Sequence, residues 1–405
     1  MMLLLCQACG SGSEETSGDD SGVKEPSQLE INVYTPGHPV VTRAEKVDPD
    51  ADEKEVKSLQ IWVFVSEAKS SEAGTLPVGH LVGYLSPQIS TPSSTDFVGK
   101  YQLTVSDLFT ALRPKVNVYV VANVGPSNTG YALTASSTME ELENALIHKV
   151  NDVDYFGLSS PMMTAVPEDG LPMSGVLKGT DVGGSQPVLK VQTPVTVVRA
   201  VSKVRFLFSR SKQYTSEEEY GSSQELRITG ITIDNGMIPK AGYLFLADEY
   251  SVDGSSPNVH PVTTGDAPYE SGPDEYGIAL TPLTAAATQI PEYNNPSEYV
   301  YTGEVTGQEY EDKMNDGIAA GHLAEVGKFY IRESDLLVTG WLHYTIGTDP
   351  TVKHSQFRMA RAGEFSRNHT WIVYGYFSSK ELLKIYSVNV LPWSTEYTDY
   401  PVYNW

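Results

Sequence analysis

The sequence predicts an all-β protein made of two β-sandwich domains with a few short helices. Its 405 residues suggest two or three domains, since one domain commonly holds roughly 150 residues. The 34 glycines, 25 prolines and 24 tyrosines favour strands joined by turns over helix bundles. Short strand-like runs bounded by turn residues recur along the chain, which is typical of sandwiches rather than of a parallel α/β sheet.

The charge balance excludes several kinds of partner. There are 51 acidic and 28 basic residues, which gives a formal net charge of −23. Nucleic acids and anionic membrane surfaces attract clustered Lys and Arg, so this chain is not expected to bind either. Only 20% of residues are charged and 40% are hydrophobic, so the chain has enough apolar side chains to fold.

The first nine residues are typical of the end of a lipoprotein signal peptide. Three leucines lead to Ala8 and Cys9, and a small residue before a cysteine suits peptidase cleavage and lipid attachment. The run is short and has no basic start, so we expect it to be the remnant of a longer leader. An ordinary apolar N-terminus is the alternative. Cys6 and Cys9 are the only cysteines, so neither disulfides nor thiolate metal sites are expected in the folded body.

Residues 10–43 are expected to form an acidic tether and one leader strand. Gly, Ser and acidic residues fill the first part, which cannot build a core. Leu29, Ile31 and Val33 then alternate with polar residues, which predicts a strand over 29–34. Prolines end that strand, and Arg43 and Ala44 precede a charged linker.

The N-terminal domain is predicted over residues 44–212. Runs at 59–65 and 116–123 are apolar on both faces, as expected of central sandwich strands. Thr138 and Glu141 form a capping box, which predicts a helix with an apolar stripe. A long strand is predicted over 195–208, and a polar loop after it places the domain boundary near 212.

The C-terminal domain is predicted over residues 213–405. A strand over 226–234 should end at an Asn235-Gly236 turn, and a long loop region should cover 252–296. The remaining predicted strands cover residues 299–305, 328–331, 336–346, 370–377 and 384–391.

No catalytic or metal-binding motif is assembled in the sequence, so we expect neither an enzyme nor a cofactor. A calcium-loop spacing at 48–59 lacks the required Gly and Glu, and a phosphate-loop-like run at 321–328 has the wrong glycine spacing. The eight histidines are scattered singly. The sequence does not exclude a pair of carboxylates for glycoside hydrolysis, because the fold and not the sequence sets the distance between them.

Several local patterns occur together in one order. They are TRA at 42–44, YVVAN at 119–123, LPMSG at 171–175, VRAVSKV at 198–204, SRNHTW at 366–371 and YSVNVLPW at 386–393. With the lipoprotein-like start, these patterns make the chain resemble the Bacteroidales fimbrillins, the subunits of type V pili, over essentially its whole length.

The resemblance implies two transthyretin-like β-sandwich domains and a maturation route. A lipid on Cys9 would hold the precursor at the outer membrane, and a trypsin-like surface protease would cut between Arg43 and Ala44. The strand with Leu29, Ile31 and Val33 would then leave. A donor strand from residues 384–405 of another fimbrial subunit would replace it, and the side chains expected to fill the groove are Tyr386, Val388, Val390 and Trp393. The product would be a cell-surface fimbrium that supports adhesion to a host or bacterial receptor.

Three alternatives stay open at this point. The chain could be a tip adhesin or a surface glycan-binding lipoprotein, because the Tyr-, Pro- and Gly-rich loops at 252–301 could present a binding surface. It could also be the anchor subunit, which would keep its leader and lipid. Finally, residues 384–405 could simply form the last strands of the C-terminal sandwich.

Overall fold

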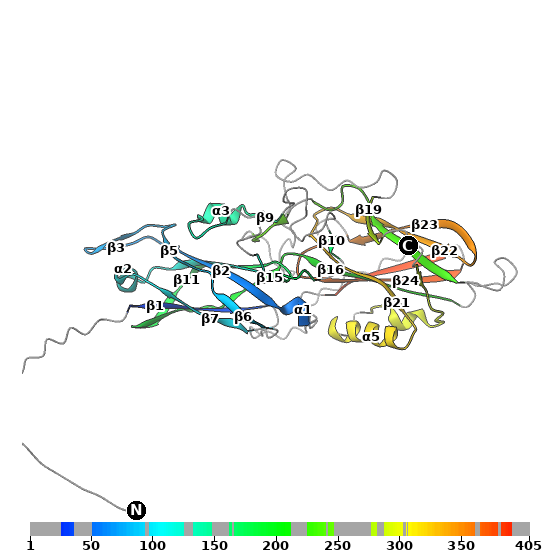
Figure 1. Cartoon of the computed structure of the whole chain (residues 1–405), viewed down its shortest axis with the longest axis horizontal. Helices are drawn as coiled ribbons and strands as arrows, with labels where there is room; N and C mark the ends of the chain where they lie inside the picture. Colours follow the sequence, from blue (N-terminus) through cyan, green and yellow to red (C-terminus); the bar gives the residue numbers. More distant parts are fainter. Residues whose placement is uncertain are drawn as a thin grey trace, which may run out of the picture.

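The structure is a computed structural model. It describes residues 26–35, 51–93, 97–124, 133–147, 162–163, 166–211, 225–239, 242–246, 277–281, 287–302, 305, 307–360, 365–379 and 382–390. Figure 1 shows an elongated molecule in which the first sheets lie at one end and the last sheets at the other. The all-β fold class predicted from the sequence is confirmed, with four main sheets and few short helices.

The first half contains two facing sheets. One has the order β15-β11-β8-β2-β5 with β6 beside β2, and the other has the order β12-β13-β1-β14 with β7 beside β1. Their bounds are β1 (Gln28–Tyr34), β2 (Val56–Val65), β5 (Leu81–Leu85), β6 (Gln88–Ser93), β7 (Phe97–Thr104), β8 (Val116–Ala122), β11 (Met173–Thr180), β12 (Val182–Ser185), β13 (Val188–Val191), β14 (Val195–Thr196) and β15 (Val198–Arg199). Side chains from both sheets form one hydrophobic core.

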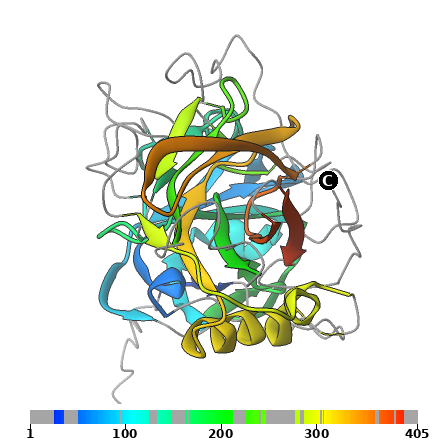
Figure 2. The same ribbon diagram turned by 90° about the vertical axis from the view of Figure 1, so that its right-hand side faces the viewer.

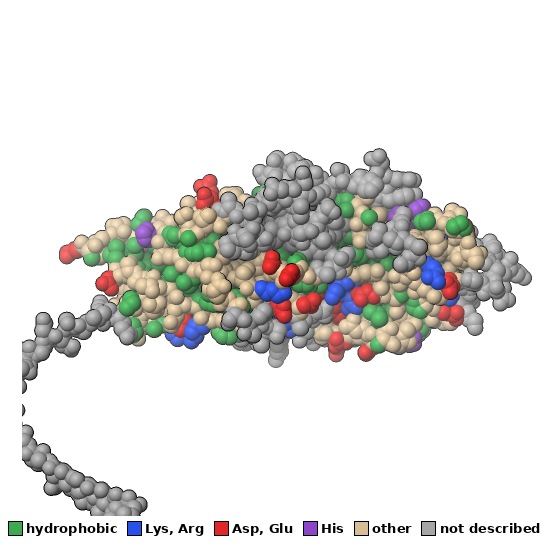
Figure 3. All heavy atoms as spheres, viewed as in Figure 1, with side chains coloured by type: hydrophobic (Ala, Val, Ile, Leu, Met, Phe, Trp, Pro, Cys, Tyr) green, Lys and Arg blue, Asp and Glu red, His purple; other side chains and the backbone are tan. Residues whose placement is uncertain are grey.

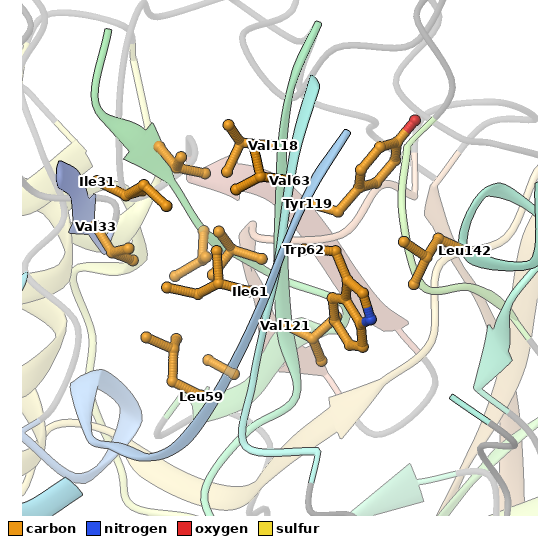
Figure 4. Packing of buried hydrophobic residues seen from close by; sticks show 14 of the residues in the cluster. Ile31, Val33, Leu59, Ile61, Trp62, Val63, Val118, Tyr119, Val121 and Leu142 are labelled. Carbon is orange, nitrogen blue, oxygen red and sulfur yellow. The ribbon is translucent and has the colours of Figure 1, made fainter. Parts of the chain in front are cut away.

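The two central strands of this half are buried on both faces, as their sequence predicts. On one side of β2, Ile61 points toward β1, and on the other side Trp62 lies toward Leu142 (Figure 4). Trp62 Nε1 donates to the carbonyl of Thr134 at 2.9 Å, so its polar atom is paired. Leu142 belongs to α3 (Met139–Glu143), whose Thr138–Glu141 capping box is confirmed.

The second half also pairs two sheets around its own core. One has the order β10-β21-β16-β24-β25, and the other has the order β19-β17-β22-β23 with β20 beside β17. Their bounds are β10 (Met162–Met163), β16 (Ser202–Arg210), β17 (Leu226–Ile233), β19 (Ile278–Thr281), β20 (Thr288–Gln289), β21 (Ala324–Ile331), β22 (Val338–Ile346), β23 (Asp349–Ala360), β24 (Thr370–Ser379) and β25 (Leu382–Val390).

Small elements complete the fold. Helix α5 lies along one side of the second half, below the strands in Figure 2, and covers a cluster rich in tyrosine. The small elements are α1 (Ala51–Lys54), β3 (Lys69–Ser71), β4 (Gly74–Leu76), α2 (Asp107–Leu112), β9 (Leu146–Ile147), β18 (Gly242–Tyr243), the 3-10 helix η2 (Pro296–Tyr299) and α5 (Gly307–Ala319). Within the described residues, no helix is long and apolar enough to cross a bilayer.

A buried ion network joins α1 to the second half. Lys203 Nζ on β16 lies 3.0 Å from Glu53 Oε1 on α1 and 3.6 Å from Glu311 Oε1 on α5. Arg205 lies 3.0 Å from Glu311 and 2.6 Å from Glu325. Glu53 is completely buried, so its charge depends on these partners. On the face in Figure 3, acidic and basic side chains are mixed around the middle of the molecule.

Several sequence expectations differ from the structure. The region 252–296, predicted as a long loop, contains the strands β19 and β20. The long strand predicted over 195–208 is divided into β14, β15 and β16, because the chain passes there from the first core to the second. In the described part of 299–305, the strand prediction is wrong: Tyr299 ends η2, where Pro296 favours a helical start. Helix α5 was not predicted. The predicted boundary near 212 lies outside the described residues, and the two cores separate between Val201 and Val204.

Candidate functional site: the slot of the leader strand

The strand β1 is inserted between other strands of the first half. On one side it runs antiparallel to β7 over its whole length, and on the other it runs parallel to β13 and then to β14. Backbone bonds continue at its ends, since the amide of Val105 donates to Ser27 at 2.9 Å and that of Val197 donates to Tyr34 at 2.8 Å. We call the space that β1 fills, bounded by β7, β13 and β14, the slot.

The inner face of β1 completes the first hydrophobic core. Leu29, Ile31 and Val33 all have exposed fractions of 0%. Ile31 and Val33 point across the core toward the facing sheet, with Ile61 of β2 opposite (Figure 4). Burial of each such side chain stabilises the fold by roughly 1.5–3 kcal/mol before entropy costs. The predicted leader residues are thus brought together, and their burial makes β1 a structural part of this sandwich.

The outer face of β1 carries a carboxylate held between two lysines. Glu30 is only 5% exposed. Its Oε2 lies 3.4 Å from Lys100 Nζ on β7, and its Oε1 lies 3.4 Å from Lys190 Nζ on β13. Both lysine side chains are about half exposed, so each pair adds little stability alone, but together they mark one position along the slot. Sequence reasoning did not find this site, because its members come from three separate strands.

The wall formed by β13 and β14 is interrupted. Residues 28–30 pair with 188–190, and the pairing resumes only when Val33 meets Val195. Even-numbered amides of β1 face this wall, as the bond from Gln28 N to Pro187 O at 2.8 Å shows. Asn32 lies at the interruption, and in the described ladder its position has no paired residue on that side. A strand in the slot therefore needs no amide donor there.

An aromatic contact closes the far end of the slot. The rings of Tyr34 on β1 and Phe97 on β7 have centroids 5.0 Å apart at an angle of 53°. Phe97 is 42% exposed, so this pair lies where the slot reaches the surface. A tilted aromatic pair adds roughly 0.5–1.5 kcal/mol beyond area burial.

Three of the predicted donor residues lie on a strand away from the slot. Tyr386, Val388 and Val390 lie on β25, whose backbone pairs antiparallel with β24 in the second half. The predicted lipidation residue Cys9, the cleavage residues Arg43 and Ala44, and the donor residue Trp393 lie outside the described residues. Their roles therefore stay predictions.

The described residues also contain two buried histidines that the sequence did not single out. His343 Nδ1 on β22 lies 2.6 Å from His354 Nδ1 on β23, and burial followed by the nearby His354 lowers the pKa of His343 to about 4. Burial likewise lowers the pKa of His369 to about 4. Within the described residues, no group of three or more His, Cys, Asp or Glu side chains could hold a metal ion.

Comparison with known proteins identifies the fold. No family model and no curated protein matches the sequence. Among solved structures, a candidate cell adhesion protein from Parabacteroides distasonis aligns with a TM-score of 0.52 and 13% identity, covering 91% of this chain and 98% of that one. A candidate cell adhesion protein from Bacteroides eggerthii gives 0.47 and 14%, covering 93% and 98%. A fimbrilin from Porphyromonas gingivalis gives 0.43 and 11%, covering 92% and 93%.

The first of these matches shows a shared fold over nearly the full length of both chains. At this level of identity the match concerns the fold, and the function is argued from the slot.

Proposed function

We propose that this chain is a structural subunit of a cell-surface fimbrium that supports adhesion and assembles by exchange of strands between copies. The observation that carries the proposal is the position of β1. A strand that precedes the predicted cleavage residue Arg43 fills the middle of a sheet and completes a core. The shared fold with a candidate cell adhesion protein supports it.

Removal of β1 would create a strong demand for a replacement strand. Both neighbouring walls would lose their backbone partners, and the three apolar side chains would leave the core open. An extended segment from another chain repairs such a gap by β-augmentation, with main-chain hydrogen bonds for affinity and alternate side chains for specificity. The slot therefore suits a strand supplied by a second subunit.

The maturation route places each event on a residue of this chain. Lipid on Cys9 would carry the precursor to the outer membrane, and a trypsin-like protease would cut between Arg43 and Ala44. The released leader would then leave the slot to a strand from residues 384–405 of a neighbour, for which Tyr386, Val388, Val390 and Trp393 are the sequence candidates. Both cysteines would depart with the leader, so contacts between subunits would rest on strand pairing and apolar burial.

Limited trypsin treatment of the purified chain tests this route. We expect a fragment that begins at Ala44, followed by a ladder of oligomers on a gel of unboiled samples. Arg43→Ala is the matched control, and it should stay monomeric under the same treatment. A fragment that begins at Ala44 and remains monomeric at all concentrations would contradict the proposal.

Deletion of residues 384–405 tests the source of the donor. The deleted chain should still be cut after Arg43 but should form no ladder, while near-UV circular dichroism should show a folded N-terminal half. Immunogold labelling then locates the subunit in the fimbrium. Signal along the filaments indicates a stalk subunit, signal only at the ends indicates a tip adhesin, and an uncut lipidated N-terminus indicates an anchor.

A further inference from the structure

The residues around the slot favour a particular strand sequence, by charge as well as by the alternation of apolar side chains. Counted from Leu29, its first, third and fifth positions face the core, as the complete burial of Leu29, Ile31 and Val33 shows. Its second position is bracketed by the lysines that hold Glu30, Lys100 and Lys190. A carboxylate at that position would keep both ion pairs, whereas any other residue would leave two cations facing one neutral group.

The fourth and sixth positions add two further conditions. At the fourth position, where Asn32 lies, the wall is interrupted, so even a proline loses no ladder hydrogen bond there. At the sixth position an aromatic ring meets Phe97 with a centroid distance of 5.0 Å to Tyr34. The slot therefore favours a strand that has an acidic residue at the second position and an aromatic residue at the sixth position. The fourth position places no condition on the backbone amide.

One stretch of this chain's C-terminal segment satisfies these conditions. Residues 398–403 read TDYPVY, against LEINVY for residues 29–34 of the leader. Aligned in this way, Asp399 takes the place of Glu30, Pro401 falls at the interruption, and Tyr403 takes the place of Tyr34. The register set by the other acid, Glu396, would instead put Asp399 at the buried fifth position, which is costly for a carboxylate.

We propose that residues 398–403 of a second copy of this chain occupy the slot, in the register that places Asp399 between Lys100 and Lys190. This proposal rests on the proposed function, because it names the donor that strand exchange requires. Apolar burial then comes mainly from Tyr400 and Val402, since Thr398 is smaller than the Leu29 it replaces. At its first position the donor would fill the slot less fully than the leader does.

The pairing of β25 favours residues 398–403 as the donor over the other candidate stretch, residues 386–391. That stretch, YSVNVL, matches the apolar positions but puts Ser387 at the position bracketed by lysines. Residues up to Val390 also pair with β24, from Ser379 to Thr370, so their use would remove the edge strand of the second half. Use of residues 398–403 would leave β25 paired with β24, and residues 391–397 can span about 23 Å before the donor strand begins.

Charge reversal in the full chain tests the register. The variants are Asp399→Lys, the acceptor swap Glu30→Lys with Lys100→Glu and Lys190→Glu, and both changes combined. The Glu30→Lys change keeps the leader matched to its slot before cleavage. Glu396→Lys is the control for charge alone. Trypsin would also cut after the lysines introduced at 396 and 399, so every chain carries the site of a protease that does not cut after Lys in place of Arg43. Each chain is cut with that protease after its melting curve shows a folded precursor, and the concentration for half-maximal ladder formation is measured.

We expect the donor variant and the acceptor swap each to need at least about tenfold more protein than the unchanged chain, because two ion pairs become repulsions. The combined variant should return to within about threefold of the unchanged chain, and Glu396→Lys should have no effect. Normal ladders from Asp399→Lys, or no recovery in the combined variant, would overturn the register. If the unchanged chain itself forms no ladder after cleavage, strand exchange fails and this inference falls with it.

Discussion

At the scale of single residues, the slot separates two kinds of contribution. Leu29, Ile31 and Val33 supply affinity through burial, while Glu30 supplies position through two long ion pairs. The alternation of the first three could be predicted from the sequence alone. Lys100 and Lys190 could not, since their meeting at Glu30 depends on how three strands pair.

Truncation of Ile31 should weaken the precursor but not the mature subunit. Ile31→Ala removes a fully buried side chain, so we expect the free energy of unfolding of the uncut chain to fall by about 2–5 kcal/mol. Asn32→Ala on the outer face should change it by less than about 0.5 kcal/mol. Urea unfolding measures both, and equal effects of the two variants would contradict a structural role for the leader.

The buried His369 predicts a loss of stability in mild acid. Its Nδ1–H donates to the carbonyl of Arg367 at 2.7 Å, and burial lowers its pKa to about 4. The unfolded chain takes up a proton below about pH 6.5 and the folded chain does not, so stability falls between pH 6.5 and about 4. Relative to wild type, His369→Gln should lose about 2 kcal/mol less between pH 6.5 and 5 in urea titrations. An unchanged pH slope would contradict this assignment.

At the scale of elements, the helices α1 and α5 both contact Lys203 of β16, and α1 thereby connects the start of the predicted N-terminal domain to the second half. Helix α1 follows the predicted cleavage residue in the chain and holds Glu53 against Lys203 of β16 at 3.0 Å. In the proposed route, this contact would hold the beginning of the mature body to the second half after the leader leaves. Helix α5 completes the same network through Glu311. Its Tyr310, Met314 and Ile318 recur every four residues and pack in one cluster, which is the sequence signal by which it could have been predicted.

Neutralising Glu53 should uncouple this connection. Glu53→Gln removes the carboxylate nearest to the buried Lys203, so we expect a loss of about 3 kcal/mol in the free energy of unfolding. Glu55→Gln is the matched control on the surface, where its ion pair with Lys57 is partly exposed, and it should cost less than about 1 kcal/mol. Similar losses for both variants would show that the buried network is not a connection between the halves.

Some of these elements could be predicted from the sequence and others could not. Strands apolar on both faces, such as β2 and β8, and the capped helix α3 could be predicted because their signals are local. The division of residues 195–208 into three strands could not, because Val195 to Arg199 pair in the first half while β16 pairs in the second. The residues before and after the point where the chain enters the second half have similar strand propensity, so the sequence does not mark that point.

At the scale of the whole molecule, the proposed donor would give one chain both a slot and a segment whose sequence matches it. A surface on one copy then matches a segment of the next, which gives a head-to-tail contact that repeats without closing. Such contacts generate filaments, in agreement with the proposed fimbrial role. The mature body would contain no cysteine, so an introduced pair can report this contact without competing thiols.

Disulfide trapping in the cut chain measures this contact most directly. Glu30 lies opposite Gln102 in a pair without mutual hydrogen bonds, where Cα atoms are about 4.5 Å apart and a disulfide can form. A chain with Cys6→Ser, Cys9→Ser, Gln102→Cys and Asp399→Cys should therefore give covalent oligomers under oxidation after cleavage at Arg43, and only monomers when uncut or when Glu396→Cys replaces Asp399→Cys. Polymers that form after cleavage without any covalent link between positions 102 and 399 would contradict the account.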